Sequence, residues 1–245
     1  MTAQSLYLIC IPLIIAAEYC FARNQLGESR QDRWLTNVSL GFINEAVVLA
    51  SPVWIALLLP TPEAALLPGL WGALLAFVLM DLFLYWLHRG YHAFGLMWRL
   101  HRVHHCDLDL DFTTSFRHHP GEVVANLVII YALMAGFGFS PLQVAPYLVF
   151  ARLVQLVAHA NIRLESRTSR LLQALLVTPD VHEIHHSPHQ PLTDSNYGEV
   201  LTIWDRLFGT FTAPRPLTGP VNIGLAEFRA VDDQRLGALL RQPLR

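Results

Sequence analysis

Charge of both signs is scarce in this chain, and lysine is absent. All 17 basic residues are arginine, charged residues make up 15% of the 245 positions, and the formal net charge is −2. Soluble domains contain about a quarter charged residues, so this shortage, together with 53% hydrophobic residues, is typical of a membrane protein. A near-neutral chain also offers nucleic acid no electrostatic attraction. We therefore expect a membrane protein without a nucleic-acid partner.

Cysteine is rare, and histidine is missing from both ends of the chain. Cys10, Cys20 and Cys106 form no C-x-x-C pair, and the first two lie within one apolar run. Neither a disulfide framework nor a cysteine-bound zinc is indicated. All twelve histidines lie from His88 to His189. A chance distribution does not account for this concentration.

Apolar runs long enough to enter a bilayer alternate with polar segments. Residues 4–22, 38–59 and 70–87 form three such runs, and residues 123–158 form a fourth, which GFGFSP at 136–141 divides into a helical hairpin. A membrane helix needs about 20 such residues. The predicted fold class is all-α: a polytopic membrane helical bundle with a cytoplasmic helical cap that carries a histidine-rich dimetal site.

The arginines divide the connecting segments into two groups. Segments 23–34, 88–120 and 159–213 contain most of the arginines, whereas 60–69 and 136–141 contain none. Since positively charged loops stay on the cytoplasmic side, we expect the N-terminus outside and the histidine-rich segments and the C-terminus in the cytoplasm. The chain is then a multi-pass protein, which we assign to a bacterial inner membrane.

Three histidine clusters have the spacing of metal ligands. His88 and His92 are four residues apart at the end of an apolar run, and H-x-x-H-H occurs twice, at 101–105 and 182–186. Residues at i, i+3 and i+4 are neighbours on a helix surface, and imidazole binds zinc, copper, iron and nickel. The predicted ligands are His88, His92, His101, His104, His105, His182, His185 and His186, with His119 of FRHHPGE and His159 of HANI as further members.

The third cluster also matches the zinc-protease pattern H-E-x-x-H, in which the glutamate acts as general base. Such an enzyme needs three protein ligands, whereas ten histidines suffice for two ions with about five ligands each. We therefore interpret Glu183 as incidental, facing away from the His182/His186 side or into solvent. A zinc-dependent membrane hydrolase that uses these three residues stays an alternative, as does a non-enzymatic metal transporter or sensor.

The ordered set of motifs resembles the fatty acid hydroxylase/sterol desaturase superfamily of integral-membrane di-iron oxygenases. The matching pieces are DLFLYWLHRGYH (81–92), WRLHRVHH (98–105), TSFRHHPGE (114–122), HANI (159–162), TPDVHEIHHS (178–187) and NYGEVLTIWDRLFGTF (196–211). We expect a catalytic domain over 75–213, between N-terminal membrane helices (1–74) and a peripheral tail (214–245). The family often has an aromatic residue at the position of His118, so His118 is left out of the ligand set.

The resemblance implies a cytoplasm-facing, non-haem di-iron centre held by the ten histidines named above. It implies O₂ activation at two iron ions, for which zinc can substitute, and hydroxylation or desaturation of an unactivated C–H bond in a fatty acyl, sterol or related lipid substrate. A separate electron donor of ferredoxin, rubredoxin or cytochrome b5 type is also implied, because the chain has no nicotinamide or flavin fingerprint.

Two groups of polar residues near the histidines invite a structural interpretation. Partners beyond the ligands can orient metal-binding imidazoles, and residues at a helix end can instead anchor it at the membrane surface. Both interpretations stay open for Asp81, Tyr85 and Arg89. A structural closing element without a catalytic role is expected at Trp204, Asp205 and Arg206.

Overall fold

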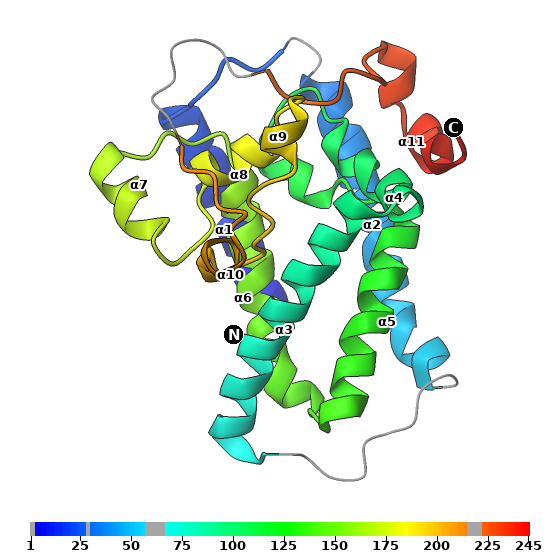
Figure 1. Ribbon diagram of the computed structural model, residues 1–245. Helices are drawn as coiled ribbons and strands as arrows, with labels where there is room; N and C mark the ends of the chain where they lie inside the picture. Colours follow the sequence, from blue (N-terminus) through cyan, green and yellow to red (C-terminus); the bar gives the residue numbers. More distant parts are fainter. Residues whose placement is uncertain (1–2, 28–29, 57–66, 215–221) are drawn as a thin grey trace.

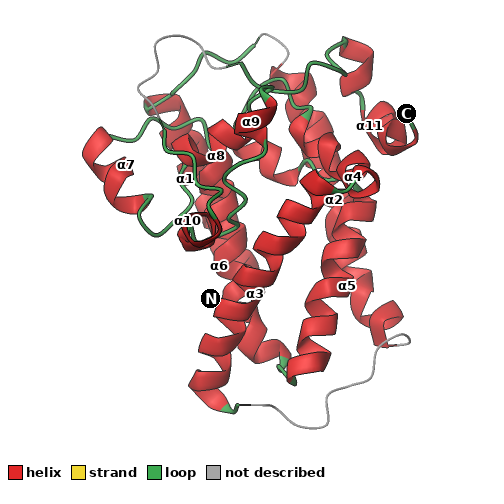
Figure 2. Ribbon diagram, viewed as in Figure 1, coloured by secondary structure: helices red, strands yellow, loops and turns green. Residues whose placement is uncertain are grey.

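The computed structural model describes residues 3–27, 30–56, 67–214 and 222–245 (Figure 1). Within these ranges the regular structure is helical apart from two isolated β-bridges (Figure 2). The longer helices are α1 (Ala3–Cys20), α2 (Arg30–Ala56), α3 (Gly69–Ala93), α5 (Pro120–Phe137) and α6 (Pro141–His159). The shorter ones are α4 (Gly95–His105), η1 (Phe112–Phe116), α7 (Ser166–Leu172), α8 (Pro179–His185), α9 (Gln190–Thr193), α10 (Ile203–Phe208), η2 (Val231–Gln234), α11 (Leu236–Arg241) and η3 (Gln242–Leu244). The predicted all-α class is confirmed.

Three of the described helices, α3, α5 and α6, are long and apolar enough to cross a membrane. Gly138 ends α5 with a φ of 68°, a left-handed conformation that glycine adopts without strain. Ser140 then caps α6, and Pro141 occupies its first turn. The helical hairpin predicted around 136–141 is therefore confirmed.

The two N-terminal helices differ from these three in composition or length. The part of α1 whose side chains the structure describes, Ile9–Cys20, is apolar and by itself shorter than a membrane span. Helix α2 begins at Arg30, before the apolar run expected from 38, and has Asp32 in its first turn, where a negative charge favours a helix start. Most of the connection expected at 60–69 lies outside the described residues. The crossing of the membrane by these two helices stays a prediction.

The short helices gather at one end of the long ones. In Figure 1, α4, α8 and α9 lie around the upper ends of α3 and α6, while the lower ends of α3, α5 and α6 are free of such cover. The membrane-length helices therefore form a stem, and the short helices form a cap that follows directly from its ends.

Asp81 joins the stem to the cap. It lies in the middle of α3 with no exposed surface. Its carboxylate accepts hydrogen bonds from Tyr147 of α6 at 3.1 Å, from Trp204 Nε1 at 2.8 Å, and from the backbone N–H groups of Val200 and Leu201 at 3.2 Å. Asp81 therefore binds the cap segment around α10 to two membrane-length helices.

Tyr85, one turn after Asp81 on α3, serves the same attachment. Tyr85 bonds to the hydroxyl of Thr210 at 2.9 Å and stacks on Phe208, and the guanidinium of Arg89 lies over the ring of Trp86. In the described structure none of these contacts is to an imidazole. The interpretation of Asp81, Tyr85 and Arg89 as direct partners of the ligands is therefore wrong.

Part of the C-terminal tail, residues 222–245, packs against the helices. Leu239 and Gln242 are buried, and Leu239 packs with Leu40 of α2 and Val103 of α4. Arg102 donates to the backbone carbonyl of Gln242 at 2.6 Å. Leu239 therefore completes the packing between α2 and α4, whereas Val231 and Leu244 of the same tail are exposed.

We predict that Asp81→Ala strongly destabilises the protein, because it leaves four donors without their acceptor. Buried unsatisfied donors cost about 1–3 kcal/mol each, and a loss of 2–3 kcal/mol lowers the midpoint of thermal unfolding by about 5–10 °C in a chain of this size. The midpoint is measured on detergent-purified protein. Asp81→Asn keeps an acceptor oxygen and is expected to lose less; an Ala variant as stable as the parent would contradict this role.

Candidate metal centre

The two H-x-x-H-H motifs lie on helices α4 and α8. Together with histidines of α3 and α6, their histidines form two clusters, and each motif contributes to both. On α4, His101 and His105 belong to one cluster and His104 to the other. At α8, His185 belongs to the first cluster, whereas the other two histidines of the motif belong to the second. In each motif the two histidines that are four residues apart share one face of the helix, and the remaining histidine lies to one side of that face. Identical spacing therefore serves two adjacent sites.

We name the first group the five-histidine cluster and the second the four-histidine cluster. The five-histidine cluster consists of His88, His92, His101, His105 and His185, and the four-histidine cluster consists of His104, His159, His182 and His186. Within each cluster the candidate ligand nitrogens all lie within 4.8 Å of one another. The structure thus brings together nine of the ten histidines predicted as ligands.

The spacing of the ring nitrogens in each cluster fits a metal ion. In the five-histidine cluster, Nε2 of His101 lies 3.1 Å from Nε2 of both His88 and His105. Successive Nε2 atoms of the four-histidine cluster are 2.9–3.2 Å apart. Neighbouring ligands on an octahedral ion with metal–nitrogen bonds of about 2.1 Å are about 3.0 Å apart. The observed distances match that value.

Hydrogen bonding makes these nitrogens candidate ligands for a cation. The Nδ1 atoms of His88 and His185 face the backbone carbonyls of Tyr197 and Ser195 at 2.9 and 2.8 Å, so each Nδ1 carries the proton of the neutral ring. Their Nε2 atoms then present lone pairs to the cluster. Among the described atoms, Nε2 of His185 has no hydrogen-bond partner. A metal ion satisfies these lone pairs.

Carboxylates orient two further rings of the five-histidine cluster. Nδ1 of His101 lies 2.8 Å from Glu122, and Nδ1 of His92 lies 3.2 Å from Asp194. Such partners fix the tautomer and the orientation of a ligating imidazole. In the four-histidine cluster, the one ring with an Nδ1 partner in the described structure is His159, which bonds to Gln155 O at 2.7 Å. The two clusters therefore differ in ligand number and in the charge around them.

Burial keeps the cap histidines in the form that binds metal. Desolvation, followed by the proximity of other imidazoles, holds the pKa well below 6.5 for His104, His105, His182, His185 and His186. Neutral imidazole is the ligand form. The cap therefore presents uncharged ligands at neutral pH.

The sequence assigned the wrong member of the His118–His119 pair to this region. His119 lies outside both clusters: its Nδ1 accepts a hydrogen bond from Gly121 N at 3.0 Å as the cap of α5, and its Nε2 faces Leu240 O at 3.2 Å. His118 instead stacks on His104, with ring centroids 4.3 Å apart. Burial opposes its charged form, but the Glu122 carboxylate at 3.0 Å outweighs this and raises the pKa of His118.

Glu183 points away from both clusters, as one of the two orientations considered for it requires. Its carboxylate is buried, forms an ion pair with Arg23 at 2.5 Å and accepts from Asn24 Nδ2 at 2.6 Å. A carboxylate occupied in this way is not placed to activate a metal-bound water. The H-E-x-x-H interpretation therefore lacks its general base.

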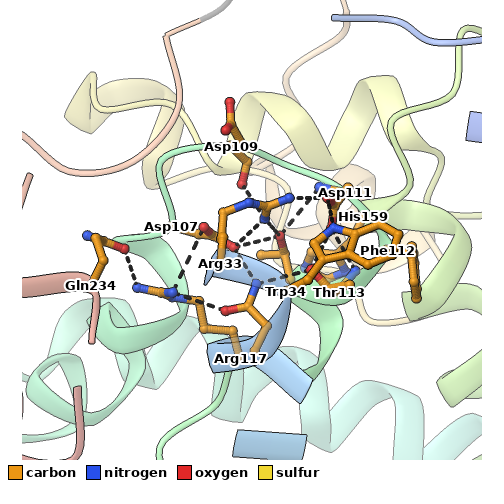
Figure 3. Close-up of polar contacts among 12 residues, drawn as sticks. Arg33, Trp34, Asp107, Asp109, Asp111, Phe112, Thr113, Arg117, His159 and Gln234 are labelled. Carbon is orange, nitrogen blue, oxygen red and sulfur yellow. Dashed lines mark hydrogen bonds and ion pairs between the residues drawn. The ribbon is translucent and has the colours of Figure 1, made fainter. Parts of the chain in front are cut away.

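Figure 3 shows a buried polar network that fixes the loop after α4. Arg33 of α2 donates to Asp107 at 2.9 Å and also to Asp111. Arg117, which has no exposed surface, donates to Gln234 in the C-terminal tail at 2.6 Å. The loop that joins the histidines of α4 to His118 is thereby held from both ends of the chain. Sequence analysis missed this network, because its members are scattered single residues.

The closing residues of the cap have the structural role expected for them. Asp205 accepts hydrogen bonds from the backbone N–H groups of Tyr197 and Gly198 at 2.7 and 2.9 Å. Arg206 donates to the carbonyl of Gln173 at 2.9 Å. Asp205 thereby positions the chain whose Tyr197 carbonyl orients His88.

We predict that the metal-free protein loses stability as the pH falls from 7 to 5. An unfolded histidine titrates near about 6.5, whereas the five cap histidines have lowered pKa values in the folded chain. Below pH ~6.5 the unfolded chain therefore binds more protons, so acid favours unfolding. The thermal midpoint at pH 7.5, 6.5 and 5.5 is the measurement. His105→Gln is expected to flatten the pH dependence and exposed His189→Gln to leave it unchanged; equal slopes in all three proteins would contradict the account.

Residues 73–210 match the family described as fatty acid hydroxylase. Alkylglycerol monooxygenase of Homo sapiens is 33% identical over 157 residues, which are 62% of this chain and 34% of that protein. Ornithine lipid hydroxylase OlsE of Rhizobium tropici is 31% identical over 158 residues, 64% of this chain and 46% of that protein. Lathosterol oxidase of Homo sapiens is 29% identical over 139 residues, 57% of this chain and 44% of that protein. No solved structure matches.

The chain spans about a third to a half of the length of these relatives. The region that matches the family covers more than half of the chain and contains all nine histidines of the two clusters. The resemblance inferred from the histidine motifs is thereby confirmed: this chain belongs to the fatty acid hydroxylase family.

Proposed function

We propose that this chain is a membrane-bound, non-haem di-iron oxygenase that hydroxylates or desaturates an unactivated C–H bond of a lipid. The observation that supports this most directly is the pair of adjacent imidazole clusters at the ends of membrane-length helices. The relatives support the lipid, since their names refer to an alkylglycerol, an ornithine lipid and lathosterol. Fatty acyl, sterol and related lipids all belong to the substrate class that we propose.

The two clusters are proposed to hold one iron ion each. Five imidazoles on one ion and four on the other leave at least one position on each for O₂, water or substrate if both are six-coordinate. Iron pairs of this kind supply the activation of O₂, and zinc can substitute for iron in a histidine site. The protein's own residues provide the remaining conditions: Glu122 and Asp194 orient imidazoles, and burial of the ligands excludes water from the centre.

An apolar groove along the membrane-length helix α6 supports a lipid substrate. It has a volume of about 250 Å³ and lies between α6, α7 and the start of α8, with Phe150, Val154, Val157, Leu176 and Pro179 among its lining residues. Because α6 is a membrane-length helix, this groove is available to acyl chains of the surrounding bilayer. We propose that the lipid's alkyl chain lies here.

Electrons for the reaction are proposed to come from a separate protein of ferredoxin, rubredoxin or cytochrome b5 type. The arginine distribution supports a cytoplasmic position for the cap, where such donors are available. Residues 1–74 are proposed as N-terminal membrane helices and 75–213 as the catalytic domain.

The two alternatives receive less support from the geometry. A zinc hydrolase that uses His182, Glu183 and His186 requires Glu183 near the metal, but Glu183 is paired with Arg23. A transporter usually binds its ion near the middle of the bilayer, whereas the clusters lie at the ends of α3 and α6 and in the cap.

A pair of substitutions separates the oxygenase from the hydrolase. We expect Glu183→Gln to keep lipid oxygenation within about tenfold of the parent, because glutamine still accepts hydrogen bonds from its two partners; removal of a general base costs about 10²–10⁴-fold. His88→Ala is expected to abolish oxygenation, because it removes a proposed iron ligand. Oxygen consumption and mass spectrometry of the lipid product are the measurements. Hydrolytic activity that survives His88→Ala and disappears with Glu183→Gln would contradict the proposal.

A further inference from the structure

One part of the N-terminal region contacts two segments that carry candidate metal ligands, although it lies outside the residues that match the family. Residues 18–24, which we name the N-terminal clamp, run from the end of α1 into the following loop, whereas the family match begins at residue 73. In Figure 1 this end of α1 lies at the level of the cap, beside the upper end of α6. The contacts of the clamp lead to two histidine-bearing segments.

The backbone of the clamp pairs with the chain that follows His159. An antiparallel bridge joins the two segments. Arg23 N donates to the carbonyl of Asn161 at 3.2 Å, and Arg163 N donates to the carbonyl of Phe21 at 2.8 Å. The end of α6, where His159 lies, is therefore held by a short piece of sheet-like pairing.

Asn161 is the centre of this contact. It is 5% exposed and lies two residues after His159. Its N–H donates to the carboxylate of Glu18 at 2.9 Å, its Oδ1 accepts from Asn24 N at 2.8 Å, and its Nδ2 donates to Asn24 O at 2.9 Å. The same oxygen of Glu18 accepts from Phe112 N at 2.8 Å. Together with Arg23 N, which donates to the carbonyl of Asn161, four polar groups of the clamp therefore fix one buried residue close to His159.

The clamp also fixes helix α8. Glu183 lies between His182 and His186 in the sequence and is 3% exposed. Arg23 pairs with one of its oxygens at 2.5 Å, and Asn24 donates to the other at 2.6 Å. The clamp therefore contacts the segments that contain three of the four ligands in the four-histidine cluster.

The five-histidine cluster is supported from a different part of the chain. In the described structure its imidazoles take their Nδ1 partners from Glu122 and from Asp194, Ser195 and Tyr197. None of these partners belongs to the clamp. Helices α4 and α8 carry ligands of both clusters, but the residues that form hydrogen bonds around each cluster come from different parts of the chain.

We propose that the N-terminal clamp positions the four-histidine cluster selectively, so that the two metal sites depend on separate parts of the chain. This inference rests on the proposed two-metal centre. Loss of a clamp contact then lowers the occupancy of one site and leaves the other filled. A purely structural role in folding would affect both sites together.

Glu18→Ala and Glu18→Gln form the matched pair for the test, because glutamine keeps the acceptor oxygen that binds Asn161. Each protein is loaded anaerobically with ⁵⁷Fe(II), and iron content and Mössbauer spectra are recorded. We expect Glu18→Gln to retain about two irons per chain and Glu18→Ala about one, if each cluster binds one ion. The signal lost in Glu18→Ala should be the one lost in His159→Ala. Asp194→Ala, which removes a partner from the five-histidine cluster, should keep that signal.

Two results would overturn the inference: full occupancy of both sites in Glu18→Ala, or equal loss of both signals. Asn161→Ala removes the two side-chain hydrogen bonds to the Asn24 backbone beside His159 and serves if Glu18→Ala does not fold; it is judged by the same outcomes. Hydrogen exchange of the metal-free protein is the independent readout. Glu18→Ala should increase exchange in residues 159–163 and 181–186 more than in 88–101. If the parent protein binds no metal pair, the proposed function fails, while this exchange pattern still decides whether the clamp positions these segments.

Discussion

The rest of this structure depends on one constraint. Buried imidazoles present their nitrogen lone pairs to one another across about 3 Å. The Nδ1 proton of His88 is donated to the Tyr197 carbonyl, and that of His101 to the Glu122 carboxylate. A neutral ring that donates from Nδ1 has only an acceptor at Nε2, and these two acceptors face each other at 3.1 Å. A cation between the rings removes the conflict. The fold therefore holds these rings in an arrangement that the proposed metal ions would stabilise.

Different elements of the chain together hold the histidines in this arrangement. The membrane-length helices contribute ligands at their ends, the cap contributes the two H-x-x-H-H helices, and buried carboxylates such as Glu122 and Asp81 fix the joints between them. The chain outside the catalytic region is part of the same scaffold. The Arg33 network holds the loop after α4, and the C-terminal tail packs against α2 and α4. Residues remote from the histidines in sequence thus set the accuracy of the centre.

Much of the fold and of the candidate site was predictable, because both leave periodic patterns. Membrane-length apolar runs predicted α3 and the α5–α6 hairpin, and i, i+4 spacing predicted that His101 would lie with His105. Spacing could not decide between His118 and His119, since that choice depends on which ring caps α5. It also could not show how the histidines divide five to four, because this division depends on where the histidines of α3 and α6 meet those of α4 and α8.

The remaining differences between the predictions from sequence and the structure come from single residues scattered along the chain. Asp81 and Glu183 are each one carboxylate in an ordinary stretch of sequence, and their partners are distant in the chain: Trp204 and Val200 for Asp81, Arg23 for Glu183. The tail, which contains Pro and Arg, was expected to be peripheral, and the sequence did not show that Leu239 within it would be buried against α2 and α4. Long-range pairing of this kind has no local signal.

The central claim is that nine imidazoles hold two metal ions, and that those ions are iron. The most direct test is X-ray absorption spectroscopy with elemental analysis on detergent-purified protein from iron-supplied cells, handled anaerobically. The account predicts about two irons per chain, with nitrogen and oxygen ligands near 2.1 Å and no sulfur ligand. A single tightly held zinc with three histidine ligands, unaffected by His88→Ala and His101→Ala, would contradict it.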